Sequence, residues 1–281
     1  MRSLMIGAFT VVTLMLAACG GDPASPTGEL SMMPDGNDRI LLDLRGPLQQ
    51  ATNVEEALAL FPGGDHTPVR GARNSVGWSF ARNFDGQGTS ALRADWNVAV
   101  GDQGVWIISY FTGRRPRELF IRFKGRLGKH PADPDANGSD NVFPLFPQSN
   151  SMKRLLIARD GVDGGDKDRI DYVWTRTDPS VARVQIDNLN WGDDGSASTW
   201  TASNIVGREY TTTIYVKVSS SNGARDGIYR VWIDEVRVID QTGVNLDAYA
   251  LDRIEFPSIT HGFPVPASEY YWDFLVWSPV R

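Results

Sequence analysis

The stretch ELFIRFKGRL, residues 118–127, decides the fold. Its side chains alternate between two faces of an extended chain. One face holds Leu119, Ile121, Phe123 and Leu127, and the other holds Phe120, Arg122, Lys124 and Arg126. A period of two, with one apolar and one largely polar face, is typical of a half-buried antiparallel strand. This segment therefore predicts a strand that covers a core on one side only.

Other segments repeat this pattern along the chain. Residues 210–218 and 228–240 alternate in the same way, and each is expected to form one strand. Shorter strand candidates are residues 91–100, 106–111, 153–158, 170–174, 183–186 and 271–277. Turns rich in Gly, Asp and Asn separate them, and the best helix signal is the short segment 53–61, with Asn53 as its N-cap. Many short strands with such turns predict an all-β sandwich or barrel.

Five segments in order carry a family resemblance. They are GTSALR at 88–93, ELFIRFK at 118–124, KRLL at 153–156, GIYRVWID at 227–234 and YWDF at 271–274. Together they resemble strands of concanavalin-A-like jelly-roll domains of the polysaccharide-lyase-like and laminin-G-like type, from about residue 80 to the C-terminus. The resemblance implies a jelly-roll sandwich of two antiparallel sheets. Glu235 departs from it, because the family usually has a turn glycine there, so a longer or altered hairpin is expected.

The N-terminus has the pattern of an export signal. Arg2 precedes an apolar run over residues 4–18, which is shorter than the roughly 20 residues of a transmembrane helix. The run ends in LAACG, residues 16–20, which resembles a bacterial lipobox, so Cys19 is expected to carry a lipid. Gly20 replaces the Asp that in Gram-negative lipoproteins tends to mean inner-membrane retention. We therefore expect a lipid-anchored protein of the cell envelope, at the outer membrane.

Composition completes the expected organisation. Residues 1–18 are predicted to be a lipoprotein signal peptide, 19–38 a lipidated flexible tether, and 39–281 the jelly-roll domain. Cys19 is the single cysteine, so an intramolecular disulfide and cysteine-based metal sites are excluded. The net charge of −6 argues against nucleic acid as a partner. The membrane is expected to be a partner only through the lipid.

The polar strand faces suggest a binding groove for a polysaccharide. The predicted binding residues are Arg122, Lys124, Arg126, Tyr215, Lys217, Arg230 and Trp232. Arginine pairs in bidentate fashion with carboxylates, and the faces of sugar rings stack on Trp and Tyr. A basic row with aromatic residues on an acidic protein would suit an anionic, uronate-bearing glycan. Such rows are also common on solvated strand faces, where lysine discourages edge pairing; the sequence leaves both interpretations open.

Three function classes remain open: a surface-anchored carbohydrate-binding lipoprotein, a polysaccharide lyase acting by β-elimination, and a structural or protein-interaction module. The lyase would need a cation to neutralise the uronate, together with a base and an acid. Its candidate catalytic residues are Tyr215, Arg122, Lys124, Lys153 and His130. The other histidines, His66 and His261, also lie in expected loops. Glycoside hydrolysis needs a spaced carboxylate pair, and the sequence shows no such motif.

A structural calcium ion is a further expectation. Residues 133–138 begin like an EF-hand loop, but its twelfth position is Pro144, where a bidentate Glu is required. A second acidic loop spans residues 160–168. Jelly rolls of the resembled family often hold one Ca²⁺, sometimes through an Asp of the last strand, which here would be Asp273.

Overall fold

The computed structural model describes residues 32–63, 65–66, 77–96, 103–111, 113, 115–140, 151–159, 169–178, 181–187, 197–202, 207–246, 248, 250–260 and 266–280. Residues from Met32 onward form one compact unit, distinct from residues 1–31. The predicted signal peptide and Cys19 therefore lie outside the described residues. No helix in the described part of the chain is long and apolar enough to cross a membrane.

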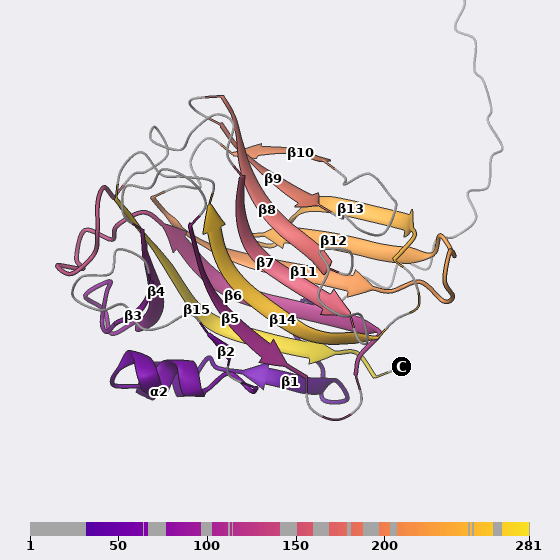
Figure 1. Ribbon diagram of the computed structural model, residues 1–281, viewed down its shortest axis with the longest axis horizontal. Coiled ribbons are helices and arrows are strands. Elements are labelled where there is room, and N and C mark those ends of the chain that lie inside the picture. Colours follow the sequence, from indigo (N-terminus) through magenta and orange to yellow (C-terminus); the bar gives the residue numbers. More distant parts are fainter. Residues whose placement is uncertain are drawn as a thin grey trace, which may run out of the picture. The chain divides into compact units, whose positions relative to one another are not determined.

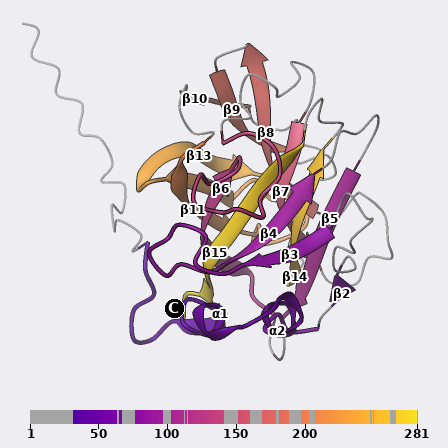
Figure 2. The ribbon, with the colours of Figure 1, turned by 90° about the vertical axis from the view of Figure 1, so that its left-hand side faces the viewer.

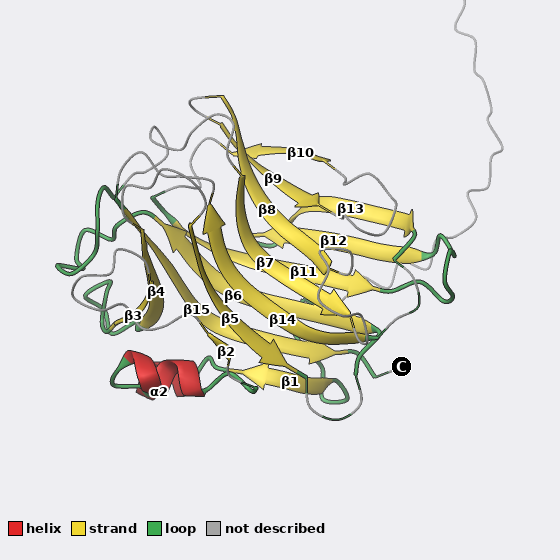
Figure 3. Cartoon of the chain, in the orientation of Figure 1, coloured by secondary structure: helices red, strands yellow, loops and turns green. Residues whose placement is uncertain are grey.

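Two antiparallel sheets make up this unit (Figures 1 and 3). The first has the order β13 (Val236–Val244), β12 (Gly227–Ile233), β11 (Glu209–Lys217), β6 (Glu118–Leu127), β15 (Ala267–Ser278), β4 (Ala91–Trp96) and β3 (Gly77–Ala81), with β1 (Arg39–Asp43) also paired to β15. The second has the order β10 (Ala197–Ala202), β9 (Val181–Asp187), β8 (Arg169–Asp178), β7 (Ser151–Arg159), β14 (Leu251–Thr260), β5 (Gln103–Tyr110) and β2 (Asp65–His66). The predicted all-β jelly-roll sandwich of two antiparallel sheets is confirmed.

The core lies between the two sheets, which Figure 2 shows as separate layers. Phe123 of β6 meets Phe256 of β14 edge to face, with ring centroids 6.0 Å apart. Phe256 also contacts Phe274 of β15 at 4.8 Å. All three rings are buried, and each contributes about 1.5–3 kcal/mol by leaving water. The apolar face of residues 118–127 thus points inward, as its alternation predicts.

Two short helices follow β1 in sequence: α1 (Pro47–Gln50) and α2 (Val54–Ala59). The predicted helix signal is confirmed by α2. The Asn53 side chain accepts a hydrogen bond from the Glu56 backbone N–H at 2.9 Å, and the Glu56 carboxylate accepts one from the Thr52 N–H at 2.8 Å. This reciprocal capping satisfies backbone donors at the start of the helix.

The prediction of a single strand over residues 228–240 is wrong. The chain reverses at Asp234 and Glu235, and β12 pairs with β13. Both turn residues have left-handed backbones, with φ of 49° and 67°, which is the geometry of a two-residue type I′ turn. The Asp234 carboxylate accepts a hydrogen bond from the Thr211 N–H at 2.8 Å. The hairpin is therefore short, and Glu235 occupies the position that favours glycine.

Strand β14 was not predicted from the sequence, and its Pro257 is unusual within a central strand. In the structure, Pro257 lies opposite Trp106 of β5. On its other side the pairing with β7 shifts register between Glu255 and Ile259. A proline has no N–H to donate, and this irregularity accommodates it.

Replacing Glu235 by glycine should stabilise the protein by about 1 kcal/mol, because a side chain at positive φ crowds the backbone and glycine does not. The free energy of unfolding in denaturant measures this change. Thr242→Gly is the matched control, since Thr242 is exposed on β13 without a positive φ. The control should lose about 0.5–1 kcal/mol. A loss of stability in Glu235→Gly would contradict the assigned turn.

Candidate functional site

The predicted basic row lies on the face of the eight-stranded sheet that is turned away from the other sheet, here called the outer face. Arg122 of β6 is opposite Thr213 of β11, and Thr213 is opposite Trp232 of β12. Directly paired residues of antiparallel strands share a face. The structure therefore brings the polar faces of these three strands together, which the sequence alone left open.

The aromatic residues of the outer face are buried. Phe120 stacks on Trp277 at 4.8 Å and contacts Tyr215 at 4.6 Å. Tyr215 is fully buried, and its hydroxyl donates to the Glu118 carboxylate. Trp232 is only 8% exposed. Neither aromatic residue predicted for stacking or catalysis thus presents an open ring in this arrangement.

Exposed aromatic rings lie elsewhere. Among the described residues, the aromatic side chains with large exposure are Trp106 (40%) and Tyr110 (41%) of β5, in the other sheet. They are four residues apart on one strand and therefore share a face. The Arg253 guanidinium lies 5.8 Å from the Tyr110 ring centroid. Sequence reasoning gave these two residues no role, although their even spacing was visible.

The cations of the basic row differ in their access to solvent. Arg126 is buried and donates to the carbonyls of Gly207 and Lys129, and burial lowers the pKa of its guanidinium. Lys124 keeps 44% of its side chain exposed. Arg122 is half-buried and donates to the Thr213 hydroxyl at 3.3 Å. Within the described part of the chain, Arg122 has no ion-pair partner.

The remaining predicted cations lie around this centre. Arg230 of β12 pairs with Asp240 of β13 at 2.7 Å. Lys217 is half-buried at the end of β11. Lys153 belongs to β7 of the other sheet, so it does not share the outer face. Arg122 and Lys124 are therefore the neighbouring cations at the centre of the outer face that reach solvent.

A buried ionic network closes one end of the outer face. Arg93 of β4 pairs with Asp95 at 3.0 Å and with Asp133 at 2.8 Å. The Tyr270 hydroxyl donates to Asp133 at 2.9 Å and accepts from the His130 N–H at 3.2 Å. Burial raises the pKa of the Tyr270 phenol well above its usual value, so the phenol stays protonated. These contacts fasten the segment 128–140 to the sheet.

Two residues singled out in the sequence, His130 and Asp133, belong to this network. His130 is half-buried, and its ring meets Phe84 edge to face at 5.4 Å. Its Nδ1 accepts a hydrogen bond from the Ala132 N–H at 3.2 Å. Asp133, the first acid of the EF-hand-like loop, is held by Arg93. Arg93 belongs to a strand motif of the sequence, but its pairing with Asp133 could not be predicted, because Asp133 lies 40 residues further along the chain.

A pocket of about 320 Å³ opens beside Lys124. Its walls come from α1, the β3–β4 turn, β6 and β15, and its lining residues are Gln49, Gln87, Gly88, Thr89, Lys124, Trp272 and Asp273. The Lys124 ammonium lies 2.9 Å from the Asp273 carboxylate. Gln49 joins α1 to the turn, since its amide donates to the Ser90 carbonyl at 3.0 Å and accepts from the Ser90 N–H at 2.7 Å. Nothing in the sequence indicated a binding role for Gln49 or Gln87.

Asp273, the predicted calcium ligand, is thus paired with a cation. Across the described ranges, no three His, Cys, Asp or Glu side chains gather as a metal site would require. The second acidic loop, His66's side chain and His261 lie outside the described residues. The structural calcium ion stays a prediction.

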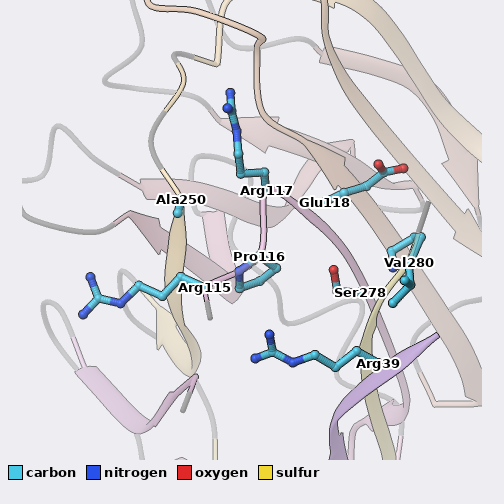
Figure 4. A pocket seen from close by; sticks show the side chains of 9 residues that line it. Arg39, Arg115, Pro116, Arg117, Glu118, Ala250, Ser278 and Val280 are labelled. Carbon is cyan, nitrogen blue, oxygen red and sulfur yellow. The ribbon is translucent and has the colours of Figure 1, made fainter. Parts of the chain in front are cut away.

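A second cavity, of about 410 Å³, lies near the start of β6 and the end of β15 (Figure 4). Its lining includes Arg39, Arg115, Arg117 and Glu118. In Figure 4 the three guanidinium groups do not converge on one point. Arg117 is also committed to the backbone carbonyls of Ser219 and Ser220. The three arginines of this cavity are therefore less suited to binding a single anion together than their number suggests.

No protein-family model matches the chain, and neither does any curated protein sequence. Among solved structures, alginate lyase Aly36B is similar over 87% of this chain and 98% of its own, with a TM-score of 0.54 and 17% identity. A substituted form of that lyase in complex with alginate tetrasaccharide gives the same values. The endo-β-1,4-glucuronan lyase of the fungus Trichoderma reesei is similar over 78% of this chain and 93% of its own, with a TM-score of 0.52 and 16% identity. At such identities the likeness shows a shared fold alone.

Proposed function

We propose that the protein binds an anionic polysaccharide on the outer face of the eight-stranded sheet, through Arg122 and Lys124. The observation that carries the proposal is the set of contacts that Arg122 makes and lacks. Arg122 is half-buried, its guanidinium contacts a neutral hydroxyl, and it has no ion-pair partner in the described part of the chain. A guanidinium in this state can bind a ligand carboxylate through two parallel hydrogen bonds.

The spacing along β6 supports a uronate-containing glycan. Arg122 and Lys124 are two residues apart on one face, which places their Cα atoms roughly 7 Å from each other. Two cations so placed, with a pocket beside them, suit a ligand that carries a carboxylate next to several hydroxyls. The alginate and glucuronan lyases that share the fold are named for polymers of this class.

Binding is the first candidate and lyase activity the second. β-Elimination needs an accessible base and acid beside the uronate. Among the described residues, the Tyr215 and Tyr270 hydroxyls are both bound to carboxylates in buried positions. Lys124 favours the second candidate, because its half-exposed ammonium lies beside the pocket, where a cation would stabilise the charge that develops on the uronate during elimination.

Arg122→Ala and Lys124→Ala should each weaken retention on alginate or glucuronan about tenfold or more. A hydrogen bond to a charged group contributes roughly 1.5–3 kcal/mol, which corresponds to such a change. Affinity electrophoresis in gels containing the glycan measures retention. Absorbance of unsaturated uronates in the same mixtures reports any cleavage, and a rise would establish the lyase.

The matched control is Arg115→Ala, which removes the same charge from the arginine-lined cavity instead of the outer face. Its retention should equal that of the unmodified protein. Loss of retention in the control but not in Arg122→Ala would move the site to that cavity. An unmodified protein with neither retention nor absorbance change would favour the structural or protein-interaction module.

The proposal includes a lipid anchor at Cys19 that holds the protein at the cell envelope, on the outer membrane. The lipobox-like sequence supports it, and several acyl chains give stable anchoring where one chain is marginal. Expressed in a Gram-negative bacterium, the protein should take up labelled palmitate and enter the detergent phase of Triton X-114. Cys19→Ala should do neither. A variant that still carried the label would refute the anchor at this residue.

A further inference from the structure

Strand β15 contains one more residue than β6 beside the pocket. Trp272 is opposite Lys124 and Leu275 is opposite Arg122, so three steps on β15 match two steps on β6. The side chains on either side of the extra residue keep their alternation, with Trp272 on the outer face and Phe274 in the core. The inserted residue is Asp273, and this is a β-bulge, a feature that redirects a side chain.

The backbone at Asp273 is strained. Its φ is +55°, in the left-handed region that costs free energy for any residue with a Cβ. The ion pair with Lys124 is partly exposed, with 44% and 30% of the two side chains accessible. Exposed ion pairs contribute little to stability, so glycine would suit this position better. Strain that stability does not explain, at the edge of a pocket, indicates a functional role.

The Asp273 carboxylate changes the charge of the site. It holds the Lys124 ammonium at 2.9 Å and largely cancels its charge. Arg45, a second cation that interacts electrostatically with Asp273, has its own partner in Asp43 at 2.6 Å. The other lining side chains of the pocket are uncharged, and Gln49, Gln87 and Thr89 among them carry both donors and acceptors. Neutral donors and acceptors of this kind match sugar hydroxyls.

We infer that Asp273 is a specificity-determining residue of this site: it neutralises Lys124 so that the pocket takes sugar hydroxyls and leaves Arg122 to bind one carboxylate. The inference rests on the proposed function. It names the ligand class more closely, as a polymer with one carboxylate per sugar. Densely sulfated polymers are disfavoured, because a fixed carboxylate repels additional anionic groups.

Asp273→Asn tests this inference in the full-length protein, because it keeps the shape of the side chain and removes its charge. Affinities for alginate and for heparin are measured by titration calorimetry at one salt concentration, with a chelator present. The variant should raise the ratio of heparin to alginate affinity roughly fivefold to tenfold, with a steeper salt dependence for heparin. Asp273→Gly should raise the ratio equally and also raise the midpoint of thermal unfolding, since glycine relieves the positive φ.

The matched control is Glu255→Gln, which removes a carboxylate from an ion pair of the other sheet, where Glu255 of β14 lies 2.8 Å from Arg253. Its affinity ratio should stay that of the unmodified protein. If the unmodified protein binds alginate and both Asp273 variants keep its ratio of heparin to alginate affinity, the inference is overturned. The proposed function then stays intact. An unmodified protein that binds neither polymer would overturn both.

Discussion

The contact of Phe123 with Phe256 across the two sheets is the constraint on which the rest of the structure depends. Burying Phe123 fixes which face of β6 points inward, and a slip of one residue would turn every side chain of the strand to the opposite face. Arg122 and Lys124 point outward because Phe123, between them, points inward. The register of β6 with β11 and β15 then decides which side chains meet these two cations. The candidate site is therefore a consequence of core packing.

Short-range patterns predicted the elements that alternate strictly. The alternation of residues 118–127 and 210–218 became β6 and β11, and the capping residues around Asn53 became α2. The pattern failed where backbone geometry departs from the usual preferences. Glu235 turns the chain without a glycine, and Pro257 lies within a central strand next to an irregular register. Both depend on tertiary packing, which local propensity does not contain.

Only part of the candidate site could be predicted from the sequence. The charges of Arg122 and Lys124 and their shared face could be predicted, whereas the depth at which each side chain lies could not. Arg126 follows the same alternation as Lys124, yet it is buried under backbone carbonyls. Tyr215 lies on the predicted face with its ring enclosed by other aromatic residues. Gln49 reaches the pocket from a different part of the chain, and no periodicity of β6 could point to it.

If a charged polymer is recognised mainly through Arg122 and Lys124, the ligand must carry an anionic group that pairs with them. If Arg122 binds a carboxylate, the affinity of the unmodified protein should depend on that group and not on the sugar backbone alone. The measurement is the dissociation constant for alginate compared with the same polymer after its carboxyl groups have been reduced to alcohols, at equal chain length and salt. The account predicts that reduction weakens binding at least about tenfold, the value of one charged hydrogen-bonded contact. Equal affinity for the two polymers would contradict it.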